Sequence, residues 1–342
     1  MDSVQQEKNK MLLFDKNMKV ILITGGAGFI GSNLILHFLK KYPEYVILNV
    51  DSLTYASDLQ NLEETEKYSN YHFINCDIRN REKLENIFKE FNPNGVIHLA
   101  AESHVDNSIS NPNIFAETNV IGTLNLLNLS LKYKVEKFHH VSTDEVFGSL
   151  GLNSPSSTED SLYKPRSPYS ASKASSDHFV SSFYHTFGLN TVMTNCSNNF
   201  GPHQHDEKLI PTIIKNLVNR KDIPVYGNGE NIRDWLYVED HCRAIDLVYH
   251  EGTPGESYNI GGDMELTNLE LIDKISNLFD NLTSNVGSNK LKKFIKDRPG
   301  HDLRYSINHD KITQELGWLP DLNFDSHLTT TIKYYIKKYE TQ

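Results

Sequence analysis

The sequence predicts an α/β fold, in which a doubly wound parallel sheet is joined to a smaller mixed α/β domain. Three observations predict it. Short apolar runs alternate with helical patterns over the first 200 residues, a glycine-rich turn follows the first run, and the alternation breaks after Phe200-Gly201-Pro202. Alternating strands and helices are typical of parallel sheets covered on both faces. A glycine-rich turn after the first strand makes the predicted sheet one of the Rossmann type.

The individual elements follow from the hydrophobic pattern. Residues 19–24 form an apolar run that ends in glycines, which is typical of a buried parallel strand. Further strands are predicted at residues 46–50, 72–75, 96–100, 138–142 and 191–194, and helices at residues 29–41, 81–91, 113–132 and 168–187.

The same pattern predicts the domain organisation. We expect residues 1–17 to be a disordered tail, residues 18–200 the dinucleotide-binding domain and residues 201–342 a second domain. Segments within about 233–260 are expected to return to the first domain. Helices of the later part are predicted near residues 208–219, 238–250 and 268–279, and an Asn- and Ser-rich surface loop at residues 280–289.

Composition excludes several classes of function. The 342 residues carry a net charge of −10, so no overall field attracts nucleic acid or an anionic membrane. No apolar run has the length of a membrane span. The cysteines, Cys76, Cys196 and Cys242, lack metal or redox spacing. These features predict a cytoplasmic protein without a metal site, in which any anionic ligand is held by a local cluster of basic groups and backbone amides.

The turn at Thr24–Gly31 has the spacing of a dinucleotide-binding loop. Gly25, Gly28 and Gly31 permit a tight turn, a close approach of the backbone to a pyrophosphate and tight helix–sheet packing. Asp51 closes the second strand twenty residues later, where a carboxylate binds ribose hydroxyls and repels a 2′-phosphate. The sequence therefore predicts NAD as the cofactor. Asp77-Ile78, after the third strand, is expected to face the adenine.

Two residues on a predicted helix form a candidate proton-transfer pair. Tyr169 and Lys173 are four residues apart and therefore share one helical face. A tyrosine pKa of about 10 must fall to about 7 for the side chain to act as a base, a change worth about 4 kcal/mol. We expect the Lys173 ammonium and the nicotinamide charge to supply it. Thr143, which follows a strand, is placed to hydrogen-bond the same substrate hydroxyl.

Asp144 and Glu145 are adjacent acids with two interpretations. Acids after a strand often cap a helix. Alternatively, one carboxylate removes a carbon-bound proton while its protonated neighbour assists the loss of a hydroxyl.

Motifs along residues 18 to about 339 resemble the nucleotide-sugar 4,6-dehydratases of the extended short-chain dehydrogenase/reductase family. The matching segments are TGGAGFIGS, DSLTYA, HLAAESHVDNSI, TNVIGT, STDEVFG, YSASKASSDH, TNCSNNFGP, EKLIP, PVYGNGENIRDWLYVEDH, YNIGG and DRPGHD. The Thr-Asp-Glu triplet is the specific element, because related epimerases usually carry small hydroxylic residues there.

The resemblance implies an activity and a role for each catalytic residue. Tyr169 takes the O4 proton of dTDP-glucose while hydride passes from C4 to NAD; Glu145 removes the C5 proton; Asp144 protonates the departing 6-hydroxyl. The product is a 4-keto-6-deoxy sugar nucleotide. UDP-glucose as the substrate remains open, because thymine and uracil differ by one methyl group worth about 1 kcal/mol. A C4-epimerase and a catalytically silent NAD-binding module are further alternatives.

The resemblance also implies sets of binding residues. The cofactor set is Gly25, Gly28, Phe29, Ile30, Gly31, Asp51, Ser52, Leu53, Thr54, Asp77, Ile78, Leu99, Ala100, Ala101, Ser103, Thr118, Tyr169, Lys173 and Asn199. The nucleotide-sugar set is Ser103, Thr143, Asn198, Glu207, Lys208, Leu209, Pro224, Val225, Tyr226, Arg233, Asn268, Asp297, Arg298, Pro299, Gly300 and His301. Leu209 and Val225 have packing as an equally simple explanation.

The resemblance further implies a homodimer, formed through the helices predicted at residues 113–132 and 168–187. Two segments depart from the family pattern: Phe147 stands where tyrosine is common, and His203-Gln-His-Asp206 replaces a loop that usually contains aromatic residues and proline. The two histidines of that loop have no further ligand at a spacing that suits a metal.

Overall fold

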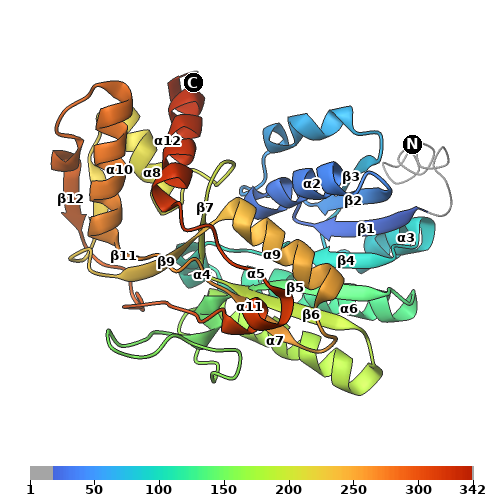
Figure 1. Cartoon of the computed structure of the whole chain (residues 1–342). Coiled ribbons are helices and arrows are strands. Elements are labelled where there is room, and N and C mark those ends of the chain that lie inside the picture. The colour runs from blue at the N-terminus through green and yellow to red at the C-terminus, as the bar shows by residue number, and fades with distance from the viewer. Residues whose placement is uncertain (1–17, 341–342) are drawn as a thin grey trace.

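The computed structural model describes residues 18–340, so the tail predicted at residues 1–17 lies outside the described residues. Its larger layer is a parallel sheet of seven strands in the order β3-β2-β1-β4-β5-β6-β10 (Figure 1). This is the Rossmann order with one further strand at the edge, and it confirms the predicted fold class. The strands are β1 (Lys19–Thr24), β2 (Tyr45–Asp51), β3 (Tyr71–Asn75), β4 (Gly95–His98), β5 (Lys137–Thr143), β6 (Thr191–Cys196) and β10 (Ser257–Ile260).

Both faces of this sheet are covered by helices. Alternate residues of β1 belong to two hydrophobic clusters, with Ile21 and Ile23 in one and Val20 and Leu22 in the other. A strand buried on both faces explains why the run is apolar without alternation. The first cluster includes residues of α2 (Phe29–Lys41) and α9 (Val238–Glu251), and the second those of α3 (Arg81–Phe91), α6 (Thr123–Lys132) and α7 (Pro168–Phe187).

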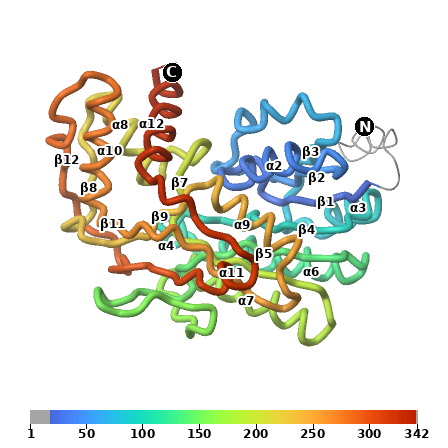
Figure 2. Tube along the Cα trace, in the orientation of Figure 1, coloured from blue at the N-terminus to red at the C-terminus, as the bar shows by residue number. Residues whose placement is uncertain are grey.

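The smaller layer lies beside the carboxyl half of this sheet (Figure 2). It contains a three-stranded sheet in the order β11-β9-β7 and a two-stranded sheet of β12 and β8. Its elements are β7 (Asn198–Phe200), α8 (Leu209–Val218), β8 (Ile223–Tyr226), β9 (Ile232–Tyr237), β11 (Glu265–Thr267), α10 (Asn268–Thr283), η4 (Ser288–Leu291), β12 (Lys292–Ile295) and α12 (Phe324–Glu340). Between them the chain returns to the large sheet, because α9 packs against α2 and β10 pairs with β6. Helix α11 (Asp310–Leu316) packs against β10 and α9 of the larger layer.

Two predicted elements differ from the structure. The helix predicted at residues 113–132 is divided into α5 (Pro112–Phe115), a π-helical segment η2 (Ala116–Gly122) and α6. The wider turn places Asn119 where its side chain bonds the backbone of Glu102 and the Ser172 hydroxyl, and such π-helical turns often occur at functional sites. The loop predicted at residues 280–289 begins later than expected, because α10 continues to Thr283.

The last helix, α12, binds the loop at residues 203–208 through several hydrogen bonds. On α12 the Tyr335 hydroxyl donates to the backbone oxygen of Gln204 at 2.5 Å, and the Tyr339 hydroxyl donates to Asp206 Oδ1 at 2.8 Å. Lys338 and Lys215 bind the same carboxylate of Asp206. The segment 203–208 is therefore fixed to α8 and α12.

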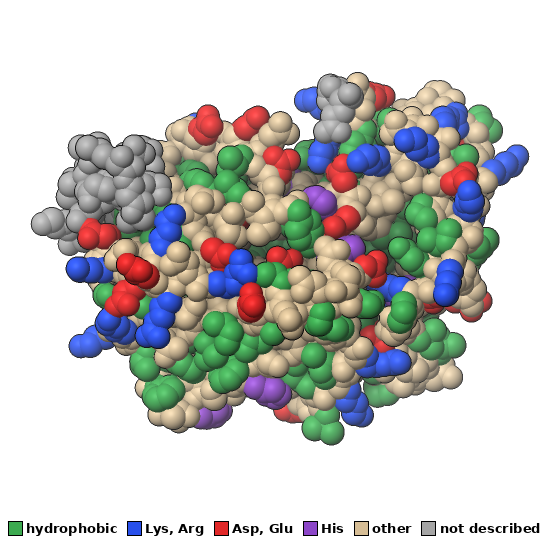
Figure 3. All heavy atoms as spheres, turned by 180° about the vertical axis from the view of Figure 1, so that it is seen from behind, with side chains coloured by type: hydrophobic (Ala, Val, Ile, Leu, Met, Phe, Trp, Pro, Cys, Tyr) green, Lys and Arg blue, Asp and Glu red, His purple; other side chains and the backbone are tan. Residues whose placement is uncertain are grey.

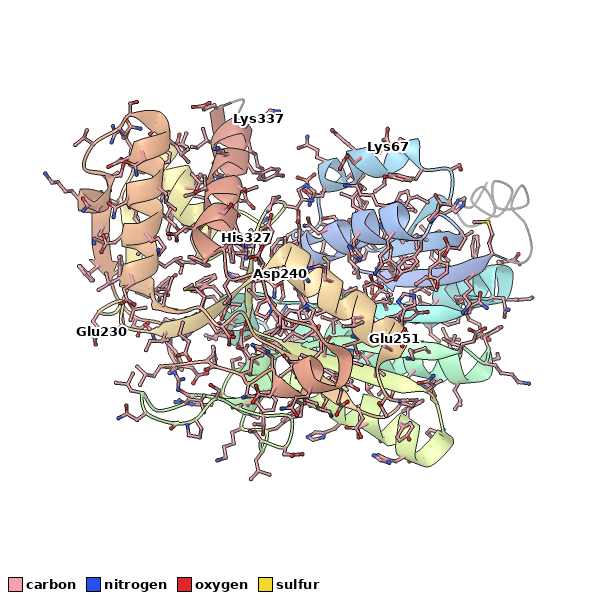
Figure 4. The ribbon with its side chains drawn as sticks, viewed as in Figure 1. Lys67, Glu230, Asp240, Glu251, His327 and Lys337 are labelled. Carbon is pink, nitrogen blue, oxygen red and sulfur yellow. The ribbon has the colours of Figure 1, made fainter. Side chains whose placement is uncertain are left out.

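A buried carboxylate joins α2 to α9. Asp246 accepts from His37 and Lys41 at 2.7 Å, from the Tyr42 hydroxyl at 2.7 Å and from His250 at 2.9 Å. Burial alone would raise the pKa of Asp246, but these hydrogen bonds outweigh it and lower the pKa. We call these five side chains the Asp246 cluster. Figure 4 shows α9, between the labelled Asp240 and Glu251, running across the face of the large sheet.

Within residues 18–340, no helix combines the length and the apolar character that a bilayer crossing requires.

Candidate active site

A cavity of about 310 Å³ opens at the carboxyl ends of the large sheet. Parallel sheets bind ligands at this edge, where the strand order changes direction. The cavity brings together most of the predicted site: Gly25, Gly28, Phe29, Ile30, Gly31, Asp51, Ser52, Thr54, Asp77, Ile78, Leu99, Ala100, Ala101, Ser103, Thr118, Thr143, Asp144, Glu145, Tyr169, Lys173, Asn198, Asn199, Glu207 and Lys208.

Other predicted residues do not line this cavity. Val225 is fully buried and Leu209 packs against the same core, which agrees with the packing explanation for both. Leu53 is partly exposed, with a φ of 55°. The remaining residues outside the cavity lining are Pro224, Tyr226, Arg233, Asn268, Asp297, Arg298, Pro299, Gly300 and His301.

The glycine turn leaves no room for side chains. A Cβ on Gly31 would lie 2.2 Å from the backbone oxygen of Gly25, and a Cβ on Gly25 would lie 2.7 Å from the nitrogen of Ala100. Gly25 also has a φ of 73°, which disfavours any other residue. Helix α2 begins after Gly28 without a side-chain cap. Its first amides are therefore free to bind the phosphates of a dinucleotide.

Asp51 is held rigidly at the end of β2. Its Oδ2 accepts from the nitrogen of Ala27 at 2.9 Å, and its Oδ1 accepts from the nitrogen of Leu53 and the hydroxyl of Ser57, both at 2.8 Å. Carboxylate oxygens have further acceptor capacity. The side chain lines the cavity, so it fits a ribose diol and opposes a 2′-phosphate.

Tyr169 and Lys173 lie in the first turns of α7, against β5. Lys173 Nζ donates to the backbone oxygen of Val141 at 2.9 Å and lies 3.3 Å from His140 Nε2. Burial lowers the pKa of Lys173, and the charge of Asp177 opposes that shift. Asp177 follows Lys173 by one helical turn, and its Oδ1 lies 3.2 Å from His140 Nε2. The ammonium is thus held by a buried acceptor and a buried counter-charge.

The pKa of Tyr169 in the protein alone moves opposite to the expected direction. Burial, and after it the charge of Glu145, raise this pKa well above its usual value, although a hydrogen bond with Thr143 lowers it. Lys173 directs its ammonium toward Val141 and His140 instead. The local protein environment therefore favours the protonated phenol.

Thr143 ends β5 and begins the short helix η3 (Asp144–Phe147). Its hydroxyl accepts from the nitrogen of Glu145 at 3.3 Å, so the cap of this helix is Thr143 itself. The same hydroxyl donates to Asp144 Oδ1 at 3.3 Å. Asp144 Oδ2 is buried and has no hydrogen-bond partner among the described residues. Asp144 and Glu145 are therefore available for chemistry, and the capping explanation is not needed.

The two acids have different electrostatic surroundings. Burial, then the charges of Glu145 and Asp234, raise the pKa of Asp144 well above its usual value. Burial also raises the pKa of Glu145, against the lowering effect of three cations: Arg233, Arg298 and Lys208. These cations are the predicted diphosphate ligands, and all three act on the same carboxylate.

Several residues of the site escaped sequence reasoning. Arg233 lies over the ring of Tyr305, 4.4 Å from its centroid, and donates to the backbone oxygen of Asp302 at 3.0 Å. The Tyr305 hydroxyl in turn bonds the Asp302 carboxylate. Asp177 had a usable signal, because it follows Lys173 by four residues. Tyr305 had none, because its approach to Arg233 depends on the path of the chain after β12.

Both histidines of segment 203–206, which departs from the family pattern, contact other side chains. His203 Nδ1 lies 3.0 Å from the Ser32 hydroxyl, and the ring of His205 meets the ring of Tyr55 edge-on. No group of three or more His, Cys, Asp or Glu side chains suited to a metal occurs within residues 18–340. Phe147 packs edge-on against the ring of Tyr163.

Comparison with known proteins places the chain in a family. The profile of the GDP-mannose 4,6 dehydratase family matches residues 22–331. A dTDP-glucose 4,6-dehydratase of Haemophilus influenzae is 47% identical over 333 residues, covering 93% of this chain and 98% of the relative.

Solved structures agree and add a contrast. A dTDP-glucose 4,6-dehydratase of Bacillus anthracis in complex with NAD superposes with a TM-score of 0.85 at 44% identity, covering 94% of this chain and 98% of the other. A UDP-glucose 4-epimerase of Thermotoga maritima reaches 0.84 at 29% identity, covering 93% and 99%. Backbone shape thus fails to separate dehydratases from epimerases, whereas identity separates them clearly. The chain therefore belongs to the GDP-mannose 4,6 dehydratase family and, within it, to the dTDP-glucose 4,6-dehydratases.

Proposed function

We propose that this protein catalyses the NAD-dependent dehydration of dTDP-glucose to dTDP-4-keto-6-deoxyglucose. The observation that carries the proposal is the convergence of Asp144 and Glu145 with Tyr169 and Lys173 in one cavity. A C4-epimerase needs only the second pair. The curated relatives act on dTDP-glucose by their names, which favours that substrate over UDP-glucose.

The residues around the glycine turn fit NAD. The pyrophosphate suits the tight turn at Gly25 and Gly31 and the uncapped start of α2. The adenine ribose suits the fixed carboxylate of Asp51. When bound, NAD supplies a hydride acceptor for C4 and a hydride donor for C6. Asp77 and Thr118 line the same cavity and complete the proposed cofactor site.

In this proposal Tyr169 accepts the proton of the sugar O4, assisted by Thr143. Because burial raises the pKa of this phenol, forming the phenolate requires added positive charge, and Lys173, which lines the same cavity, and the bound cofactor are the groups that would supply it.

The two adjacent carboxyl groups then divide the elimination between them. Asp144, whose raised pKa favours the protonated form, donates a proton to the departing O6. Glu145, which faces three cations, is the better candidate for the ionised base that removes the C5 proton. Acid and base catalysis in one step requires one carboxyl group to be protonated and the other ionised, and different environments separate their pKa values.

We assign the diphosphate of the substrate to Lys208, Arg233 and Arg298. The support is electrostatic, because the three charges converge on Glu145 in an otherwise acidic chain. One guanidinium group can bind two phosphate oxygens at once, through two parallel N–H···O bonds. The nucleobase of the substrate is assigned to the surface formed by Pro224 and Tyr226 on β8. Val225, between them, anchors β8 in the hydrophobic core.

Incubation of the purified protein with dTDP-glucose and with UDP-glucose tests the substrate assignment. We expect a 4-keto-6-deoxy product, detected by its absorbance in alkali, with catalytic efficiency about fivefold higher for dTDP-glucose, because one methyl group is worth about 1 kcal/mol. Equal efficiencies would remove the preference for thymidine, and C4 epimerisation without dehydration would overturn the proposed reaction.

We also propose that the protein is a homodimer and acts in the cytoplasm. Ile121 of η2 is 51% exposed, and Phe179 and Phe187 of α7 are 38% and 54% exposed. Figure 3 shows hydrophobic side chains gathered on the lower part of the molecule, where α6 and α7 lie. Three free cysteines suit a reducing compartment. Light scattering at micromolar concentration should give twice the chain mass, and a monomer mass would contradict the dimer.

A further inference from the structure

One of the three cations assigned to the substrate diphosphate forms an ion pair with a carboxylate of the protein. Arg298, in the segment that follows β12, lies with its Nη1 3.4 Å from Asp106 Oδ1. Asp106 belongs to the short helix α4 (Val105–Ser110), which follows β4 of the larger layer. The pair therefore connects the smaller layer to the larger one at a residue that the substrate is expected to contact.

A second assigned cation is directed at the same segment. Lys208 Nζ donates to the backbone oxygen of Ser103 at 3.1 Å, three residues before Asp106. Burial lowers the pKa of Lys208, and nearby carboxylates, Asp106 among them, oppose this shift. Residues 103–106 therefore provide acceptors for two of the three side chains that we assign to the diphosphate.

The chain that carries Asp106 is fixed, whereas the side chains of the pair can change partners. Asn119 accepts from the nitrogen of Glu102 at 2.8 Å and donates to the backbone oxygen of Glu102 at 3.0 Å, which holds the segment that leads into α4. The side chains of Arg298 and Asp106 are 28% and 37% exposed. A ligand can therefore reach the guanidinium while the backbone of α4 stays in place.

A carboxylate and a phosphate compete for the same guanidinium. Planar guanidinium groups bind both kinds of oxyanion through paired N–H···O bonds. A diphosphate that approaches Arg298 meets a charge that Asp106 already compensates in part, and the Asp106 carboxylate also repels it. A partly exposed ion pair contributes little free energy, so a more highly charged diphosphate can displace it.

We propose that Asp106 competes with the substrate diphosphate for Arg298 and so limits how tightly the protein binds its substrate and its product. Asp106 is a positioning residue, because it acts through Arg298 and not on the reacting atoms. Dehydration leaves the diphosphate unchanged, so the ion pair that the substrate displaces forms again as the product leaves. The inference rests on the proposed function, which assigns the diphosphate to Arg298.

Calorimetric titration with dTDP tests this competition without requiring turnover. The full chain with NAD is titrated as the wild type, Asp106→Asn, Arg298→Gln and the double variant. Asparagine keeps the shape of Asp106 but not its charge. Asp325→Asn is the matched control, because Asp325 forms a partly exposed ion pair with Lys274 at 2.7 Å, outside the cavity lining. Thymidine, which lacks the diphosphate, is the control ligand.

We expect Asp106→Asn to bind dTDP about two- to fivefold more tightly than the wild type, the range that a partly exposed ion pair provides. The KM for dTDP-glucose should fall with it, while kcat should not rise. The gain should disappear in the Arg298→Gln background, and neither Asp325→Asn nor thymidine should show it. A purely structural role of Asp106 would weaken binding instead of strengthening it.

Three results would overturn the competition: binding of dTDP by Asp106→Asn that is unchanged or weaker, binding by Arg298→Gln that equals the wild type, or an equal gain from Asp106→Asn in the Arg298→Gln background. The last result would mean that Asp106 repels the ligand without involving Arg298. Failure of the proposed function is distinguishable, because a wild type that binds dTDP but does not dehydrate dTDP-glucose would refute the reaction, while the titrations would still decide the competition at Arg298.

Discussion

Two buried carboxylates, Asp246 between α2 and α9 and Asp144 at the end of β5, have opposite environments. They are 1% and 3% exposed. Asp246 accepts hydrogen bonds from four side chains, and its pKa is lowered. Asp144 has one such bond, an Oδ2 without a partner among the described residues, and a raised pKa. The two carboxyl groups are buried to a similar extent, but Asp246 is stabilised as the anion and Asp144 as the neutral acid.

The difference shows how this fold separates stability from reactivity. A carboxylate surrounded by donors holds two helices together but has little tendency to take up a proton. A carboxyl that lacks donors and faces other acids is costly to bury, but it is ready to give a proton to a leaving group. Substitutions at the two positions should therefore affect different properties.

The largest expected effect is that of Asp144→Asn on elimination. An amide cannot protonate the departing O6, so we expect the rate of dehydration to fall by about 10²- to 10⁴-fold. Oxidation at C4 does not require Asp144, so stopped-flow absorbance should show NADH that accumulates without product. Loss of the NADH signal as complete as in Tyr169→Phe would contradict this separation of roles. The free energy of unfolding should not fall, because a buried acid with a single hydrogen-bond partner is replaced by a neutral group.

Asp246→Asn should show the reverse behaviour. It removes the negative charge and replaces one of the two accepting oxygens with an NH2 donor, and we expect it to lower the free energy of unfolding by about 2–3 kcal/mol. Urea titration followed by circular dichroism measures this change. The kcat of the folded fraction should stay within about twofold of the wild type, because the cluster lies outside the cavity lining. A loss of kcat larger than the loss of stability would show that the two regions are coupled.

The pH dependence of stability should also differ in sign. Because the folded-state pKa of Asp246 lies below that of the unfolded chain, its contribution is complete above pH of about 4 and is lost as pH falls. The stability difference between wild type and Asp246→Asn should therefore shrink on acidification. For Asp144 the folded-state pKa is raised, so its carboxyl disfavours folding increasingly as pH rises above about 4. Asp144→Asn should accordingly gain stability relative to the wild type between pH 4 and neutrality. Unfolding titrations at several pH values check both trends.

The smallest effect expected is that of His37→Ala. Its imidazole supplies one of four bonds to Asp246, and Lys41, Tyr42 and His250 remain. A loss of about 1 kcal/mol in the free energy of unfolding follows. A loss equal to that of Asp246→Asn would mean that the cluster acts as a unit, which a double-mutant cycle with Lys41→Met would then measure.

Sequence reasoning succeeded where local pattern decides the structure. The glycine turn, the end of β2 at Asp51 and the strand–helix alternation depend on nearest neighbours, and each lies where it was predicted. Tyr169 and Lys173 lie on the same helix, α7, as their spacing predicted, but the Lys173 ammonium is directed at Val141 and His140.

The parts that sequence reasoning missed depend on contacts between distant segments. The π-helical turn at Asn119 is stabilised by Glu102 and Ser172, which are 17 and 53 residues away along the chain. The direction of the pKa shift at Tyr169 depends on burial, which spacing does not reveal. Arg233 and Tyr305 meet because the chain after β12 returns to run beside the start of β9, where Arg304 bridges to Ile232.

The attachment of segment 203–208 to α12 has a consequence for how the protein is made. The glycine turn emerges from the ribosome among the first residues of the chain, but one wall of the same cavity is held by Tyr335 and Tyr339. Residues 203–208, which form part of the substrate side of the cavity, reach their place only when helix α12 has been synthesised and docked. Binding of the nucleotide sugar should thus follow synthesis of α12, and a nascent chain that stalls before residue 324 should bind it weakly.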